Sequence, residues 1–175
     1  MSESVQEHRN SAPQGLRIAV MTVSDTRTME TDTSGALIVA LLEAAGHTVI
    51  ERMIVPDEPD RMTPILSDWS SRDDLHAVLI TGGTGISPRD QTFETVSTLL
   101  TKPLPGYGEL FRMLSYAEIG SATILSRAVG GLMNRLVVLV MPGSRAAVSL
   151  AMTKIILPEL QHLVGEARKG TLSNK

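Results

Sequence analysis

The chain has 175 residues, a formal net charge of −3 and 42% apolar residues, which is enough for the core of one ordinary domain. The negative charge and the aromatic content of 3% argue against nucleic-acid binding, and the lack of cysteine excludes disulfides, zinc–thiolate sites and cysteine nucleophiles. No apolar run has the length of a membrane span and the first residues lack the apolar core of a signal peptide, so we expect a cytoplasmic protein without a membrane or nucleic-acid partner.

Residues 1–14 are rich in Ser, Glu, Asn and Pro, so we expect a disordered tail there and a single domain over residues 15–175. The apolar stretch Leu16–Ser24 predicts a first strand. It ends in a polar loop that contains Ser24 and Asp25. An ordinary turn and a binding role are equally good interpretations of this loop.

A helix and a second strand follow. Asp32, Thr33 and Ser34 are all good N-cap residues, and the apolar residues after them recur at helical spacing. Gly46 then suits the end of a helix. His47–Val55 predicts the second strand, which stops at a loop containing proline.

Asp57 lies in the polar loop between the second strand and the next helix, whose apolar stripe includes Met62 and Leu66. As an N-cap, its carboxylate would stabilise the first turn of that helix. Alternatively, Asp57 faces the same crevice as Asp90, because both follow the carboxyl end of a strand. The sequence leaves both interpretations open.

The third strand begins at Ala77 and runs into a loop that is rich in glycine and precedes a helix over Phe93–Leu100. The loop residues with binding chemistry are Gly82, Gly83, Thr84, Gly85, Ser87, Arg89 and Asp90. Glycine lets the backbone approach a ligand, and the hydroxyl, guanidinium and carboxylate beside it suit phosphate with Mg²⁺. The spacing fits neither the Walker A nor the dinucleotide-binding pattern, so a plain tight turn is the alternative. If the loop binds ligand, a valine at Gly83 should block binding and leave the fold intact.

The next region, residues 102–131, is rich in glycine and proline. Residues 102–108 contain too many helix breakers for a helix, and the apolar spacing predicts a short helix over Leu110–Ala117. Residues 121–127 and the Gly130-Gly131 pair indicate irregular structure or an edge strand.

Leu136–Met141 is a run of apolar residues that predicts a buried strand. It ends at Pro142 and Gly143, after which Ser144 is a suitable N-cap for a helix. We expect Pro158 to interrupt that helix.

Alternating strands and helices with buried apolar strands predict an α/β fold of three layers, α/β/α, with a mostly parallel sheet. Right-handed crossovers would bring the loops after four strands to one edge of the sheet. These loops are Ser24-Asp25, Pro56-Asp57, Thr81–Asp90 and Pro142–Ser144. The residues alone therefore indicate a phosphate-binding crevice that contains several carboxylates.

Four segments together resemble the molybdenum cofactor biosynthesis family that includes MoaB and MogA, and the resemblance extends over roughly residues 16–160. The segments are Thr81–Gly85 with Arg89-Asp90, Pro105–Tyr116, Ile124–Ala128 and Met141–Ser144. Glu118-Ile119-Gly120 is more similar to the MoaB branch than to the MogA branch.

The resemblance implies a molybdopterin-binding α/β fold and a homo-oligomer, either a trimer or a hexamer. It implies adenylylation of molybdopterin by Mg-ATP with release of pyrophosphate, and transfer of the product to a molybdenum-insertion protein. Asp57 and Asp90 match the family's catalytic aspartates, and both are candidate Mg²⁺ ligands. The expected substrate- and nucleotide-binding residues are Ser24, Asp25, Gly82, Gly83, Thr84, Gly85, Ser87, Arg89, Gly108, Glu109, Ser126, Arg127, Pro142, Gly143 and Ser144.

A non-catalytic carrier of molybdopterin in the same pathway is the alternative function. The presence of Asp57 and Asp90, together with the Ser-Pro-Arg-Asp end of the glycine loop, favours the enzyme. A general nucleotide-binding regulator fits the four segments less well.

Overall fold

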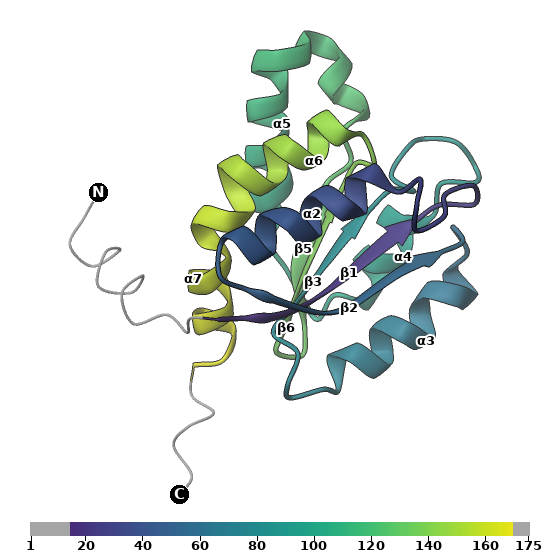
Figure 1. The fold of residues 1–175 in the computed structure, drawn as a ribbon. Helices are drawn as coiled ribbons and strands as arrows, with labels where there is room; N and C mark the ends of the chain where they lie inside the picture. Colours follow the sequence, from purple (N-terminus) through teal and green to yellow (C-terminus); the bar gives the residue numbers. More distant parts are fainter. Residues whose placement is uncertain (1–14, 170–175) are drawn as a thin grey trace, which may run out of the picture.

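The computed structural model describes residues 15–169, so the tail expected over residues 1–14 lies outside the described part. A six-stranded sheet forms the middle layer, in the order β2-β1-β3-β6-β5-β4, and helices cover both of its faces (Figure 1). The strands are β1 (Arg17–Val23), β2 (Thr48–Val55), β3 (Ala77–Thr81), β4 (Lys102–Pro103), β5 (Val129–Met133) and β6 (Leu136–Met141). Strands β1, β2, β3 and β6 are parallel, whereas β5 is antiparallel to β6 and β4. The predicted three-layer α/β fold with a mostly parallel sheet is confirmed.

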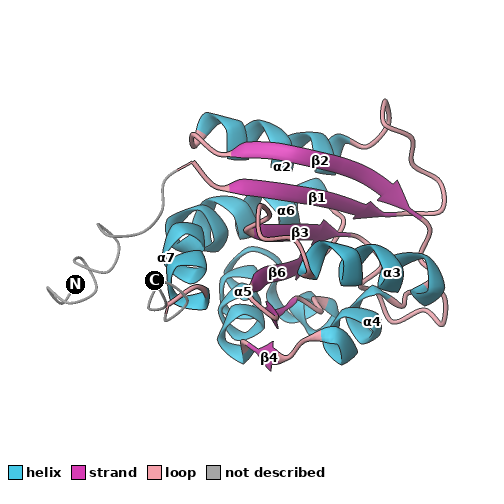
Figure 2. Cartoon of the chain, turned by 90° about the horizontal axis from the view of Figure 1, so that it is seen from below, coloured by secondary structure: helices cyan, strands magenta, loops and turns pink. Residues whose placement is uncertain are grey.

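Two cores lie on opposite faces of the sheet (Figure 2). One face packs against α2 (Thr33–Ala44), α5 (Pro105–Ile119), α6 (Arg145–Ala151) and α7 (Leu157–Ala167), and the other against α3 (Pro59–Ser70) and α4 (Thr92–Leu99). Successive strand residues alternate between the cores, so Ile18 belongs to the first and Ala19 to the second. Because β3 and β6 are buried on both faces, they read as continuous apolar runs. Within residues 15–169, no helix is both long and apolar enough to cross a membrane.

The parallel register brings the ends of four strands together at one edge of the sheet. Val23 at the end of β1 is paired with Val55 at the end of β2. Thr81 at the end of β3 is paired with Thr22 of β1 and with Met141 at the end of β6. The four loops that follow these strands therefore start side by side, as the sequence predicts.

Helix α5 differs from the sequence prediction, because it begins at Pro105 and includes residues for which no helix is predicted. Proline is tolerated in the first turn of a helix, where its missing N–H needs no partner. Gly108 does not end the helix but lets it pack closely, since a Cβ there would lie 2.5 Å from the carbonyl oxygen of Ala128. A short 3₁₀ helix, η1 (Gly120–Leu125), follows.

The Gly130-Gly131 pair also differs, because it lies inside β5, between β6 and β4, and not at the edge of the sheet. A Cβ at Gly131 would lie 2.5 Å from the carbonyl oxygen of Lys102 in β4. The glycine thus allows the two strands to approach. Further along, α6 and α7 are joined by a π-helical turn, η2 (Met152–Ile156), and Pro158 lies in the first turn of α7. The helix is thus interrupted by the π-helical turn before Pro158, and the prediction that Pro158 itself interrupts it is wrong.

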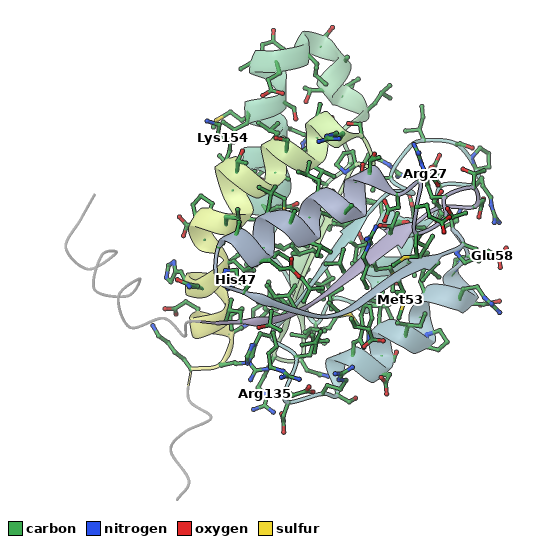
Figure 3. All side chains as sticks on the ribbon, in the orientation of Figure 1. Arg27, His47, Met53, Glu58, Arg135 and Lys154 are labelled. Atoms are coloured by element: carbon green, nitrogen blue, oxygen red, sulfur yellow. The ribbon has the colours of Figure 1, made fainter. Side chains whose placement is uncertain are left out.

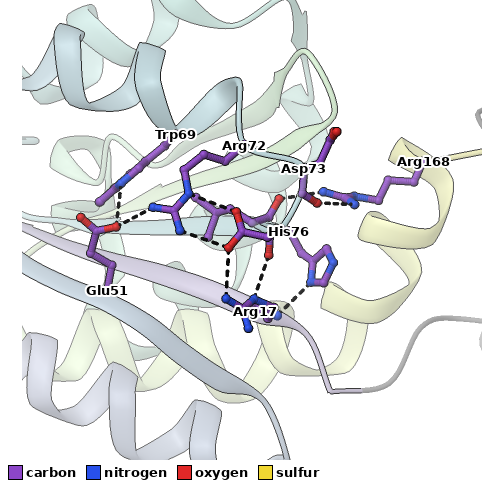
Figure 4. Close-up of polar contacts among 9 residues, drawn as sticks. Arg17, Glu51, Trp69, Arg72, Asp73, His76 and Arg168 are labelled. Atoms are coloured by element: carbon purple, nitrogen blue, oxygen red, sulfur yellow. Dashed lines mark hydrogen bonds and ion pairs between the residues drawn. The ribbon is translucent and has the colours of Figure 1, made fainter.

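The opposite edge of the sheet, where the parallel strands begin, is held by polar contacts (Figure 4). The backbone N–H of Arg17 donates to Nδ1 of His76 over 2.8 Å, and its guanidinium donates to Asp74 over 3.0 Å. At the end of α7, Arg168 donates to the carbonyl oxygen of Leu75 over 2.7 Å. These contacts tie β1 and α7 to the segment that leads into β3.

Folding stability should fall as the pH is lowered, because His76 must stay neutral to accept the N–H of Arg17. Burial, helped by the charges of Arg168 and Arg17, lowers the pKa of His76 below its ordinary value of 6.5. The unfolded chain therefore takes up a proton first as the pH falls below 6.5, and the free energy of unfolding decreases over that interval.

Thermal melts between about pH 7.5 and about pH 5 would measure this effect. The His76→Gln variant should show a weaker pH dependence than the natural chain. Some dependence should remain, because burial also lowers the pKa of His47. Equal pH dependence in the two proteins would contradict the assignment to His76.

Candidate functional site

The candidate site lies at the edge of the sheet where β1, β2, β3 and β6 end. Figure 3 shows Arg27 and Glu58 at this end of the molecule and Arg135 at the other. A cavity of about 200 Å³ opens between the loops. Its walls are formed by Thr22, Val23, Ser24, Arg27, Asp32, Ser34, Thr81, Gly82 and Gly143. Three of the four predicted loops contribute residues to these walls, whereas the Pro56-Asp57 loop does not.

Asp57 follows β2 and is only 5% exposed. Its Oδ1 accepts hydrogen bonds from the N–H of Gln91 over 3.1 Å and from the hydroxyl of Thr92 over 3.3 Å. Glu58, and not Asp57, is the N-cap residue of α3, and it makes no side-chain cap bond. The capping interpretation is therefore wrong, because the Asp57 side chain turns across the sheet edge toward the start of α4.

Two other carboxylates raise the cost of ionising Asp57. Burial raises the pKa of Asp57 first, and the charges of Asp90 and Asp25 raise it further. The Asp57 N–H donates to Oδ1 of Asp25 over 3.2 Å, and Oδ2 of Asp90 accepts the N–H of Ser87 over 3.2 Å. Asp57 and Asp90 are thus close enough for their charges to interact, but neither lines the cavity of about 200 Å³, so a crevice that both of them face stays a prediction.

Arg89 supplies the positive charge among these carboxylates. Its guanidinium forms two hydrogen bonds of 2.8 Å with Asp25 and one of 3.1 Å with Glu58. These contacts lower the pKa of Asp25 and raise that of Arg89. The structure thus places Arg89, an expected ligand contact, on the acidic residues of neighbouring loops. Glu58 is missing from the predicted set, although its position directly after Asp57 is a signal for it.

The glycine loop takes its shape from its neighbours in the protein. Gly82 and Gly83 have φ values of 99° and 63°, which are unfavourable for residues other than glycine. A Cβ at Gly83 would lie 2.0 Å from Oγ1 of Thr92 and 2.3 Å from Oδ2 of Asp57. The expectation that Gly83→Val leaves the fold intact is therefore wrong, because the added atoms would collide with the protein itself.

The far side of the glycine loop rests on Arg127. Its Nε donates to the carbonyl oxygen of Thr84 over 2.9 Å, and its Nη2 donates to that of Gly85. The expected site residues Gly108, Glu109 and Ser126 lie in α5 and directly after η1. Within residues 15–169, no hydrogen bond joins these three to the carboxylates.

The loop after β6 closes the cavity on its other side. The hydroxyl of Ser34 donates to the carbonyl oxygen of Gly143 over 2.8 Å, and that of Thr81 donates to Pro142 over 3.2 Å. Ser144 caps α6 by accepting a backbone N–H over 3.2 Å, as predicted. Its hydroxyl thus orders the loop. Ser24 plays a similar part after β1, where its Oγ accepts two N–H groups of its own loop.

Six of the nine residues that line the cavity are absent from the predicted site, namely Thr22, Val23, Arg27, Asp32, Ser34 and Thr81. Asp32 and Ser34 are recognisable in the sequence only as helix caps, and Arg27 shows no feature beyond its place two residues after Asp25. Asp32 does cap α2, but it also pairs with Arg52 over 3.0 Å. Hydrogen bonds from Gly35, Arg52 and Thr22 outweigh burial and lower the pKa of Asp32. It therefore forms a charged, fully bonded wall of the cavity.

The donor set at the carboxylates fits Mg²⁺ only in part. Within the described residues, no three His, Asp or Glu side chains are grouped closely enough to hold a metal ion. Mg²⁺ in phosphate-transfer sites usually takes one or two carboxylates and completes its shell with substrate phosphates and water. Asp57 and Asp90 supply at most two such carboxylates, so a metal ion here would need its remaining ligands from substrate and water.

A family model described as a probable molybdopterin binding domain matches residues 19–162. The chain belongs to this molybdopterin-binding family. Molybdenum cofactor biosynthesis protein B of Halalkalibacterium halodurans is 51% identical over 167 residues, which cover 95% of this chain and 98% of that protein. The resemblance to this family is confirmed.

Solved structures of the family agree in fold. A crystal structure of molybdenum cofactor biosynthesis protein B has a TM-score of 0.86 and 51% identity, and covers 90% of this chain and 98% of its own. The tungsten cofactor synthesizing protein MoaB from Pyrococcus furiosus has a TM-score of 0.77 and 36% identity, over 90% and 100% of the two chains. The sheet-edge site thus belongs to a fold that this molybdopterin-binding family shares.

Asp57→Asn should be at least as stable as the natural chain. The amide oxygen still accepts the hydrogen bonds from Gln91 and Thr92. The substitution also removes a carboxylate that is costly to ionise, since burial and the charges of Asp90 and Asp25 raise its pKa. Because the pKa of Asp57 is higher in the folded protein than in the unfolded chain, the ionised carboxylate lowers the free energy of unfolding at neutral pH. This loss of stability disappears as the pH falls through the pKa of the folded protein and the carboxylate takes up a proton.

Urea unfolding at neutral pH and again near pH 4, on the natural chain and on Asp57→Asn, would test this prediction. The advantage of the variant should shrink at the lower pH, where the natural carboxylate takes up its proton. Asp60→Asn, at an exposed position in α3, is the matched control and should show no such gain. A clear loss of stability in Asp57→Asn would instead assign a structural role to the charge.

Proposed function

We propose that this protein is a molybdopterin adenylyltransferase that uses Mg-ATP in molybdenum cofactor biosynthesis. Membership of the molybdopterin-binding family supports the pterin substrate. One observation carries the proposed chemistry: Asp57 is held buried beside Asp90 and Asp25, with its pKa raised, directly against a glycine loop. Several carboxylates close together at the edge of the sheet repel one another and do not help folding, so their presence supports a functional site.

In the proposed reaction, a phosphate oxygen of molybdopterin attacks the α-phosphorus of ATP, and the bond to pyrophosphate breaks. Asp57 and Asp90 would hold Mg²⁺, which when bound would neutralise charge on the phosphates. Backbone N–H groups of the glycine loop would orient a phosphate, and Arg27 lies in the cavity wall where it can attract anions. Reactions of this kind need positioning and charge neutralisation more than covalent chemistry from the protein.

Substitution of the two aspartates should separate the enzyme from the carrier. Asp57→Asn and Asp90→Asn remove the negative charges that hold the metal and keep side chains of the same size. We expect pyrophosphate release to fall about 10²-fold, which corresponds to about 3 kcal/mol, while molybdopterin affinity changes much less.

Both quantities would be measured on the same protein samples, with Asp60→Asn as the control of unchanged activity. If both variants release pyrophosphate at the natural rate, the catalytic assignment is wrong. If the natural chain binds molybdopterin but releases no pyrophosphate from Mg-ATP, the non-catalytic carrier becomes the better description.

We further propose that the protein forms a trimer or hexamer and passes its product to a molybdenum-insertion protein. Exposed apolar side chains on α5 and η1 support self-association, because such side chains are usually covered in an assembly. Met113, Tyr116 and Ile124 are 62%, 63% and 80% exposed. The end of α5 stands away from the rest of the molecule (Figure 1), so it is accessible to a second copy.

Light scattering should therefore give three or six times the monomer mass of 18.8 kDa. The double variant Met113→Glu/Ile124→Glu should shift the protein toward the monomer, because burying two carboxylates in an apolar contact is unfavourable. Met29→Glu, at another exposed apolar residue, should keep the oligomer. A monomer mass for the natural chain at micromolar concentration would refute the assembly.

A further inference from the structure

Arg127 makes contacts that differ from those of an ordinary ligand-binding arginine. Besides the carbonyl oxygens of Thr84 and Gly85, its guanidinium donates to both carboxylate oxygens of Glu94. It also stacks 4.9 Å above the ring of Phe93. A guanidinium has five N–H donors, and these contacts engage four of them. Arg127 is thus committed to the glycine loop and to the start of α4.

The two carbonyl contacts fix the direction of the neighbouring N–H groups. A peptide unit is planar and trans, so its N–H points opposite to its carbonyl oxygen. With the oxygens of Thr84 and Gly85 turned toward Arg127, the N–H groups of Gly85 and Ile86 turn away from it. Neither N–H donates a hydrogen bond within the described part of the chain. Two successive free N–H groups of this kind form a concave site for an anion.

The next N–H of the same loop already binds a negative oxygen. Ser87 donates its N–H to the carboxylate of Asp90 over 3.2 Å. The loop is therefore a row of outward-facing donors whose last member holds a carboxylate. Ile86 is 71% exposed, and Gly85 borders the same carboxylate, since a Cβ at Gly85 would lie 2.7 Å from Oδ2 of Asp90.

We propose that Arg127 is a positioning residue, which holds the peptide units after Thr84 and Gly85 so that the N–H groups of Gly85 and Ile86 bind a phosphate group. This inference rests on the proposed function, since it assigns the phosphate contact of the same site. It replaces the expected direct contact between Arg127 and the ligand. The planar fork of arginine is essential to this role, because lysine cannot bond two carbonyl oxygens and a carboxylate in fixed directions.

The test uses inorganic pyrophosphate as the probe, titrated into ¹⁵N-labelled protein while amide chemical shifts are followed. In the natural chain, the amide signals of Gly85 and Ile86 should move with the added anion. Arg127→Lys and Arg127→Met should both weaken pyrophosphate binding about tenfold, so that these two shifts are much smaller at the same pyrophosphate concentration. Arg135→Met, at the opposite edge of the sheet, should bind as the natural chain does.

Glu94→Gln is a milder variant, which keeps the guanidinium but loosens its anchor, and it should weaken binding less than Arg127→Met. Unchanged signals from β3 and β6 would show that each variant is folded. If Arg127→Lys binds like the natural chain and Arg127→Met does not, the contact is a direct one between charges and the proposal is wrong. Natural binding by both variants, or no response at Gly85 and Ile86 in the natural chain, would also overturn it.

The experiment is independent of adenylylation, because it needs neither ATP nor molybdopterin. If the two amides respond to pyrophosphate but the natural chain makes no adenylylated product, the positioning role stands and the proposed enzyme activity fails. If adenylylation occurs without any response of these amides, the enzyme stands and the role of Arg127 fails.

Discussion

The hydrogen bonds that Asp57 accepts from Gln91 and Thr92 connect the loop after β2 to the start of α4, and the geometry of the site depends on them. The glycine loop begins at the end of β3, which the parallel register fixes, and ends at α4, which Asp57 fixes. Both ends of the loop are therefore held by the sheet edge. The loop can then present backbone groups to a ligand without a rearrangement, which lowers the entropic cost of binding.

Charged groups meet at the glycine loop. Carboxylates of Asp25, Asp57 and Asp90 lie near its end, where Arg89 offsets part of their repulsion. Arg127 binds the carbonyl oxygens of Thr84 and Gly85 in the same loop, and the Asp90 carboxylate accepts the N–H of Ser87. In the proposed function, a metal–phosphate pair would be bound among these groups. The arrangement relates the fold to the chemistry that we propose.

Local sequence patterns, such as apolar runs and helical spacing, predict most of the fold. The buried runs that became β3 and β6 determined the parallel sheet, and the order of strands and helices then placed the four loops at one edge. Contacts between distant residues were not predictable, because nothing near Asp57 in the sequence indicates Gln91, which lies 34 positions away. The same holds for Arg127, which reaches a loop more than 40 positions before it. The sequence does not predict the helix at residues 105–108, because proline there begins the helix and Gly108 allows close packing, whereas both residue types usually indicate a turn.

The close packing of Gly83 against Asp57 and Thr92 has a consequence for how such proteins evolve. The space that a side chain at position 83 would occupy is already filled by the carboxylate and the hydroxyl. A larger residue at position 83 is therefore tolerated only after a smaller residue has replaced Asp57 or Thr92. In a relative that carries a larger residue at position 83, we expect a smaller residue at position 57, at position 92 or at both. Relatives that keep both the aspartate and the threonine are expected to keep the glycine as well.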